Sequence, residues 1–305
     1  MISGEINLCN YRPKSLIKVT GDDALSFLQG QFTNELRQDL GSATYGLWLN
    51  QKGKVVADSY VLRLAENEFQ LASVTSPAAV IRQRLEDYIV ADDVTLADET
   101  ETVHGLALMG SGCGDILEKI FGAKPEAGQY AGIGGALVFA GRRIRSENYE
   151  IIGPETAVTD FRTRLLAQGC REIGGREMEY GRIADGLPAI PPDLGPGDLP
   201  NEGGLEESAI SFTKGCYLGQ EVMARLKNLG RVRRRLQVVR GSGAPPAPQA
   251  PLYQGGKKIG EIRSVESKGN EFIALAMLSL VSLESGAGLS LRVNEPPAIR
   301  ITPHG

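Results

Sequence analysis

The chain has 305 residues, of which 42% are hydrophobic and 23% charged, and these proportions are typical of a soluble globular protein. The length exceeds what one small core needs, so we expect two or three domains. The net charge of −4 disfavours nucleic acid and an anionic membrane as general partners.

The residues able to carry metal or nucleophile chemistry are few. The four cysteines are scattered and form no CxxC pair: Cys9, Cys113, Cys170 and Cys216. We therefore expect free thiols in a reducing compartment. The two histidines are His104 and His304, and neither lies near a nucleophile motif, so we expect neither a Ser-His-Asp triad nor a metal site. No secretory signal and no apolar run of about 20 residues is found, which predicts a cytoplasmic protein without a membrane span.

The first hundred residues predict a compact αβ unit. Alternating or β-branched runs predict strands at residues 16–20, 45–50, 54–64 and 69–74, and helical spacing predicts helices at 24–32 and 77–88. The stretch from Asn50 to Gly53 is typical of a hairpin turn, and Asp22 or Asp23 is placed to cap the first helix.

A second αβ unit follows. The predicted strands are 105–109, 136–139 and 149–152, and the predicted helices are 114–121 and 156–168, the latter closed by Gly169. Short strands alternate with single helices, and no Gly-rich dinucleotide fingerprint is present. This pattern favours an α+β fold with antiparallel sheets.

The last third begins with a predicted helix at 178–185 and a Pro/Gly-rich segment at 188–204. A loop of this length is either functional or a surface excursion, and the sequence leaves both open. An apolar stripe then predicts a helix from Leu218 to Leu229, with Gly230 as its end. The arginine-rich run 231–239 alternates like a strand with one solvated face, and the remaining residues predict a small all-β domain.

The most unusual segment is KGCYLGQE, residues 214–221, in which two glycines bracket a cysteine. Glycine suits a backbone that turns sharply or approaches a ligand closely. Lys214 beside Cys216, and the helix N-terminus that follows, favour an anion there, which is either a thiolate or a ligand carboxylate. We expect Cys216, assisted by Lys214, to carry the chemistry of the chain.

KGCYLGQE, extended to FTKGCYLGQEVMARLKNLG, closely resembles the signature of the YgfZ-type folate-binding proteins, which are relatives of the aminomethyltransferase T-protein of the glycine cleavage system. Weaker agreements extend the resemblance over most of the chain: VTGDDALSFLQGQFTNEL, LWLNQKGKVVADSYV, RIADGLP and LPNEGGLEESAISF. The resemblance implies a GcvT-like α+β fold, with two intertwined subdomains in residues 1–230 and a small C-terminal β-barrel in residues 231–305.

The resemblance also implies a function. It implies a protein that binds tetrahydrofolate or a one-carbon derivative and assists iron–sulfur cluster assembly or repair through Cys216, with cluster client proteins or carriers as partners. Such a protein need not be a classical enzyme. The alternative is a folate-dependent aminomethyltransferase or methyltransferase, and a third interpretation is a thiol redox or interaction module with no folate requirement. The T-protein hairpin carries two adjacent aspartates where this chain has Ala57 and Asp58, and the missing acid disfavours aminomethyl transfer.

The candidate folate ligands come from the same comparison and from the chemistry of folate. Glu202 and Asp58 are candidates for the pterin, Arg225 is a candidate for the glutamate tail, and Asn50 matches the hairpin motif. Three motif residues either contact the ligand or lock the loop by hydrogen bonds: Tyr217, Gln220 and Glu221. Cys216 has three open roles, namely transient iron ligation, a mixed disulfide, or attack on a one-carbon adduct.

Overall fold

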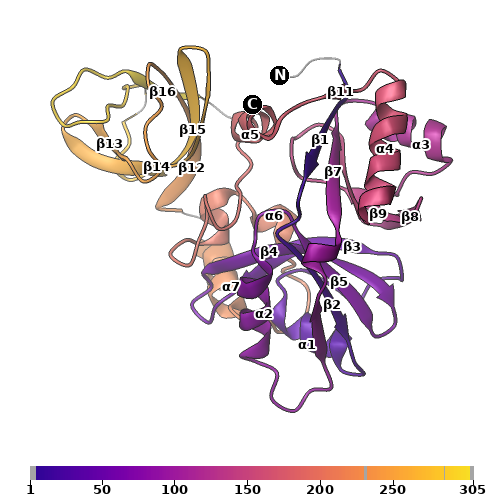
Figure 1. The fold of residues 1–305 in the computed structure, drawn as a ribbon. Coiled ribbons are helices and arrows are strands. Elements are labelled where there is room, and N and C mark those ends of the chain that lie inside the picture. Colours follow the sequence, from indigo (N-terminus) through magenta and orange to yellow (C-terminus); the bar gives the residue numbers. More distant parts are fainter. Residues whose placement is uncertain (1–4, 230–231, 285, 303–305) are drawn as a thin grey trace.

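A computed structural model describes residues 5–229, 232–284 and 286–302. Gly230, Arg231 and His304 lie outside the described residues. Three β-sheets lie around a central region that is crossed by the segment from residue 174 to residue 229 (Figure 1). The α+β class and the antiparallel sheets are confirmed, because every strand pair but one is antiparallel, the exception being β1 with β11.

The first sheet has the order β3-β4-β5-β2-β6. Its strands are β2 (Ser15–Thr20), β3 (Ala43–Leu49), β4 (Val55–Ala65), β5 (Glu68–Ser73) and β6 (Thr95–Asp98), followed by the short 3-10 helix η1 (Thr100–Thr102). Its helices are α1 (Ala24–Gln31) and α2 (Ala78–Glu86). Phe32, Trp48 and Phe69 are fully buried in the core between this sheet and its helices. The predicted helix and hairpin positions are therefore confirmed.

The second sheet has the order β11-β1-β7-β10-β9-β8. Its strands are β1 (Asn7–Tyr11), β7 (His104–Met109), β8 (Tyr130–Ile133), β9 (Ala136–Ala140), β10 (Asn148–Gly153) and β11 (Arg171–Glu172). Helices α3 (Cys113–Phe121) and α4 (Glu155–Ala167) pack on it (Figure 1). The first strand of the chain thus belongs to the second sheet, while β2 belongs to the first, so the two units are intertwined.

The third sheet is C-terminal, antiparallel and shaped as a half-barrel (Figure 1). Its order is β13-β14-β15-β12-β16, with β12 (Arg234–Ser242), β13 (Pro251–Gln254), β14 (Lys257–Lys268), β15 (Glu271–Ser279) and β16 (Ile299–Thr302). The alternation expected of the arginine-rich strand holds from Arg235 to Val238 and ends at Val239, which is also buried. Leu236 and Val238 pack into the central core, while Val239 is buried in the core of the half-barrel, so apolar residues of β12 contribute to two cores.

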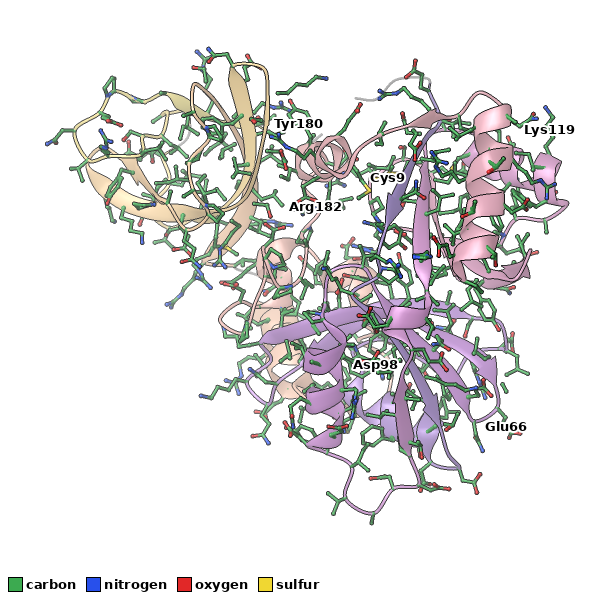
Figure 2. All side chains as sticks on the ribbon, in the orientation of Figure 1. Cys9, Glu66, Asp98, Lys119, Tyr180 and Arg182 are labelled. Carbon is green, nitrogen blue, oxygen red and sulfur yellow. The ribbon has the colours of Figure 1, made fainter. Side chains whose placement is uncertain are left out.

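The central segment connects the three sheets. It contains α5 (Gly175–Ala184), the 3-10 helix η2 (Pro200–Gly203), α6 (Glu206–Ala209) and α7 (Gln220–Leu229). A shared apolar core joins Leu47 of β3, Ile183 of α5, Tyr217 of the cysteine loop and Leu275 of β15. Buried Arg182, labelled on α5 in Figure 2, donates to the fully buried Asp193 at 2.8 Å and so holds the long loop in place.

One predicted cap is wrong. Asp23 is the N-cap residue of α1, but its side chain makes no capping bond. Its Oδ2 instead accepts the backbone N–H of Asp93 at 2.9 Å, which joins the start of α1 to the segment before β6. None of the helices in the described part of the chain has the length and apolar character that crossing a membrane requires.

Candidate functional site

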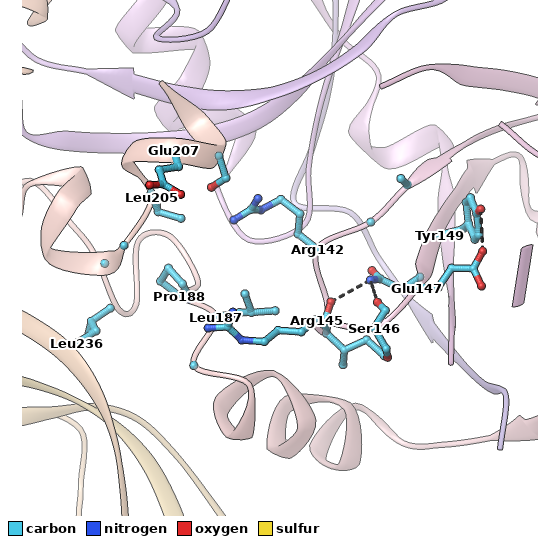
Figure 3. A pocket seen from close by; sticks show the side chains of 18 of the residues that line it. Arg142, Arg145, Ser146, Glu147, Tyr149, Leu187, Pro188, Leu205, Glu207 and Leu236 are labelled. Atoms are coloured by element: carbon cyan, nitrogen blue, oxygen red, sulfur yellow. Dashed lines mark hydrogen bonds between the residues drawn. The ribbon is translucent and has the colours of Figure 1, made fainter. Parts of the chain in front are cut away.

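A cavity of about 610 Å³ lies between the second sheet, the C-terminal sheet and the central segment (Figure 3). Its walls come from the β9–β10 loop, the Gly186–Pro188 turn, the segment 203–208 and the first residues of β12. Charged side chains from different elements line it: Arg142, Arg145, Glu147, Glu207 and Arg235. The volume falls in the range of small-molecule sites.

Asp58 lies on β4 and is not among the residues that line this cavity. Its Oδ1 accepts hydrogen bonds from the hydroxyls of Ser73 at 2.9 Å and Ser76 at 2.6 Å, and its Oδ2 accepts one from the Tyr45 hydroxyl at 3.0 Å. Burial raises the pKa of Asp58 above its usual value, although the three hydroxyl donors oppose that shift. A carboxylate has about four acceptor positions, so Asp58 keeps one for a further donor.

Arg142 connects Asp58 to the cavity. Its guanidinium carbon lies 4.2 Å from the centroid of the Tyr45 ring, and its charge also lowers the pKa of Asp58. Within the described residues, the Arg142 side chain makes no hydrogen bond or ion pair, and it lines the cavity (Figure 3). Sequence reasoning missed Tyr45 and Arg142, because Arg142 reaches Tyr45 from the other αβ unit, and no local pattern shows this contact.

Glu202 is buried in η2, and its carboxylate has protein partners. Oε1 pairs with Nε of Arg234 at 2.9 Å, while Oε2 accepts from Nη2 of Arg234 and from the Leu199 N–H. Arg234 also pairs with Asp198, which in turn pairs with Arg263 at 3.2 Å. Glu202 thus joins the long loop to β12, while the adjacent Gly203 and Gly204 line the cavity.

Lys214 anchors the cysteine loop. The side chain is buried, and its ammonium donates to three backbone carbonyls at 2.7–2.8 Å, those of Gln29, Phe32 and Asn34. The carbonyls at a helix C-terminus lack intrahelical partners, so this cation satisfies the end of α1. Burial lowers the pKa of Lys214 to about 8. An ammonium has three donors, so none is left for the sulfur of Cys216.

Cys216 is exposed, whereas Cys9, Cys113 and Cys170 are buried. The loop that presents it packs against the β3–β4 turn. Gly219 has φ +87°, and a Cβ there would lie 3.0 Å from the Asn50 carbonyl oxygen. Asn50 shapes this turn by accepting the N–H groups of Lys52 and Lys54 on its side-chain oxygen. The structure thus places Asn50 beside the cysteine loop.

The remaining motif residues differ in exposure. Tyr217 is buried in the central core, where its hydroxyl has no hydrogen-bond partner among the described residues. Gln220 reaches the Lys214 carbonyl at 3.5 Å. Arg225 and Glu221 pair with each other at 3.0 Å on the exposed side of α7, and neither lines the cavity.

The structure therefore has two separate features, the cavity beside Asp58 and the exposed thiol. No residue of 214–221 lines the cavity. Within the described ranges, no group of three or more His, Cys, Asp and Glu side chains is arranged to hold a metal ion. A cluster bound at Cys216 would need ligands from outside this chain, because a cluster normally takes about four.

Comparison with known families covers most of the chain. Residues 4–214 match the GCVT N-terminal domain, and residues 233–304 match the C-terminal β-barrel domain of CAF17. The crystal structure of the glycine cleavage system aminomethyltransferase T from Bartonella henselae superimposes with a TM-score of 0.80 at 18% identity, covering 98% of this chain and 86% of that one. At this identity the likeness shows the fold.

Curated relatives agree with these families. The tRNA-modifying protein YgfZ of Edwardsiella ictaluri is 30% identical over 74% of this chain and 68% of its own length. The mitochondrial iron–sulfur cluster assembly factor IBA57 of Homo sapiens is 29% identical over 86% of this chain and 75% of that protein. A putative chloroplast transferase of Arabidopsis thaliana is 30% identical over 81% of this chain, which spans only 59% of that relative.

Proposed function

Because the chain belongs to the GCVT N-terminal domain family, as a YgfZ-type member, we propose that it binds tetrahydrofolate or a one-carbon derivative and assists the assembly or repair of iron–sulfur clusters. The folate occupies the cavity between the sheets. The thiol of Cys216 contacts the iron–sulfur cluster or the protein that carries it. The two features are separate, so the argument for each is separate.

The chemistry of the cavity supports folate. A pterin presents N–H donors, and Asp58, which Tyr45 and Arg142 connect to the cavity, keeps one acceptor position after accepting bonds from Ser73, Ser76 and Tyr45. The Arg142 guanidinium offers a flat cationic surface and unused donors at the cavity wall. Arg235, which also lines the cavity, is better placed than Arg225 for the anionic glutamate tail.

The exposed thiol supports the role in cluster assembly, and it is the observation that carries the proposal. Cys216 alone among the four cysteines is accessible, on a loop that a buried lysine fixes to α1. Relatives with 29% and 26% identity are named iron–sulfur cluster assembly factors. A single thiol is too few ligands for a stable cluster, so the cluster is held jointly with a client or carrier protein and is cargo rather than a resident group.

Complementation tests this role. A bacterial strain lacking its own YgfZ-type protein would carry this chain, its Cys216→Ala variant or its Cys170→Ala control, with activity of a cluster-dependent enzyme as the readout. We expect the parent and Cys170→Ala to restore activity and Cys216→Ala to fail at equal protein level. Restoration by Cys216→Ala would remove the thiol from the proposal.

A second function, folate-dependent aminomethyl or methyl transfer, draws on one observation. Asp58 occupies a hairpin position at which the T-protein has an acid, and a relative is named a putative transferase. Ala57 replaces the other acid of the pair, so the pterin amine would meet one carboxylate. Incubation with tetrahydrofolate and an aminomethyl thioether donor, followed by detection of a methylene folate and of released ammonia, tests the aminomethyl transfer.

A further inference from the structure

A second cavity, of about 780 Å³, lies on the other side of the 144–146 loop from the proposed folate site. It is bordered by the ends of β1 and β7, by one face of α5 and by the end of β14. Tyr180 on α5 faces the C-terminal sheet at this place (Figure 2). The two cavities share only the wall formed by Ile144, Arg145 and Ser146.

The floor of the second cavity is apolar. Tyr180 and Ala184 lie one helical turn apart on α5, so both side chains face the same side. Met109 at the end of β7 and Ile144 of the β9–β10 loop complete the apolar surface. A ligand that occupies this floor must present apolar atoms to it, because few polar partners are available there.

The Tyr180 ring has two charged neighbours. Its hydroxyl oxygen accepts a hydrogen bond from Nη1 of Arg240 at 3.1 Å, and the Lys268 ammonium lies 5.9 Å from the ring centroid. The ring also packs against the central core, and its aromatic face can stack against a planar ligand.

The rim carries positive charge. Nη2 of Arg176 donates to the Ser267 hydroxyl at 3.2 Å, which places Arg176 next to Lys268. Arg176 also pairs with Glu266 at 3.2 Å, where the arginine side chain is 77% exposed and the glutamate side chain 17% exposed. Lys268 has no ion pair with any residue in the described ranges.

Each of the two acids that line the cavity has a contact within the protein. Glu177 pairs with Arg171, and Oδ2 of Asp185 accepts the Arg145 N–H at 2.7 Å. Among the described residues, Lys268 is the lining cation at this end that has no ion pair, and it lies with Arg176 and Ser267 at one end of the cavity.

We propose that this second cavity binds a planar aromatic anion, with its ring system against Tyr180 and Ala184 and its acid group at Arg176, Ser267 and Lys268. This ligand site goes beyond the proposed folate and cluster functions. It uses apolar burial for affinity and the two cations for orientation, and an aromatic carboxylate combines both properties.

The probe is 8-anilinonaphthalene-1-sulfonate, with its neutral relative N-phenyl-1-naphthylamine as the matched control, and fluorescence of the full chain as the readout. We expect saturable binding of the anion at one site, at least about fivefold tighter than the neutral dye. Reversing the rim charges, R176E with K268E, removes this difference. The control variant K257E with R300E carries the same charge change at exposed positions outside the cavity. It should keep the difference in affinity between the two dyes.

Ala184→Trp, which fills the floor, should abolish binding of both dyes while leaving tetrahydrofolate affinity unchanged. If that variant unfolds, the R176E with K268E variant still tests the proposal. Arg176 and Lys268 are exposed, so we expect their substitution to leave the fold intact. Equal affinity of the two dyes, or loss of anion preference in the control variant, overturns the proposal. Competitive displacement of the dye by tetrahydrofolate also overturns it, because the cavity would then belong to the folate site, whereas failure of folate to bind anywhere would affect only the proposed function.

Discussion

Lys214 and Cys216 are two residues apart in the sequence and opposite in environment. The Lys214 side chain is buried with its ammonium on three carbonyls of the α1 end, and Cys216 is exposed. The lysine therefore acts as the anchor of the loop, and the cysteine is the residue that the loop presents. The expected direct influence of Lys214 on the thiol stays a prediction.

Lys214→Met should destabilise the fold. The substitution removes the donor from two buried carbonyls and one partly buried carbonyl, and we expect the free energy of unfolding to fall by about 2–4 kcal/mol. Denaturant unfolding measures this change. Lys52→Met, at an exposed position of the β3–β4 turn, is the control and should change stability by less than about 0.5 kcal/mol. Equal effects of the two substitutions would contradict an anchoring role.

Cys216 should be the thiol that reacts in the folded protein. Burial raises the pKa of the thiols of Cys9, Cys113 and Cys170, and these side chains are inaccessible. With a coloured disulfide reagent under native conditions, we expect one fast thiol per chain and three that react only after unfolding. Cys216→Ser should remove the fast phase and leave stability within about 0.5 kcal/mol. A fast phase that survives in Cys216→Ser would show that another cysteine becomes accessible.

Tetrahydrofolate binding should weaken on acidification through the raised pKa of Asp58. The carboxylate must be ionised to accept a pterin N–H, and burial places its pKa above the usual value near 3.8. Affinity should be flat above this pKa and fall below it. Asp58→Asn should bind more weakly and lose the pH dependence. The sign for stability is opposite, because a raised folded-state pKa means that the folded protein gains stability as Asp58 is protonated.

Glu202 and Arg234 should behave as a structural pair. We expect E202Q and R234M each to destabilise the protein and to show a coupling energy of about 1 kcal/mol in a double-mutant cycle, a figure reduced because Arg234 is 40% exposed. Tetrahydrofolate affinity should change less than about threefold in both variants. A large loss of affinity in E202Q alone would instead make Glu202 a folate ligand.

Local patterns in the sequence predicted much of the fold. Helical spacing located α1, α2, α4 and α7, and the turn at Asn50–Gly53 located the β3–β4 hairpin, because each depends on neighbours in the sequence. The short strands β1, β6, β8 and β11 were missed. Their pairing depends on distant partners, as when Asn7 of β1 pairs with Met109 of β7 and with Arg171 of β11. Short polar strands of this kind carry little pattern of their own.

The sequence predicted the parts of the candidate site that depend on neighbouring residues, and it missed the contacts between distant segments. The KGCYLGQE segment and Asp58 were recognisable because a family signature and an acid in a hairpin are local features. The stacking of Arg142 on Tyr45 joins the two intertwined units, and the pairing of Glu202 with Arg234 joins the long loop to the C-terminal sheet. Both contacts join segments that are far apart in the sequence, so residue spacing does not predict them.

The most direct test of the central proposal is calorimetric titration of tetrahydrofolate, without oxygen, into the parent chain and into an Asp58→Ala, Arg142→Ala double variant. We predict saturable binding to one site at micromolar concentration by the parent, and at least about tenfold weaker binding by the double variant. Absence of saturable binding to the folded parent in this range would contradict the account. Equal affinity of the two proteins would place folate elsewhere than beside Asp58.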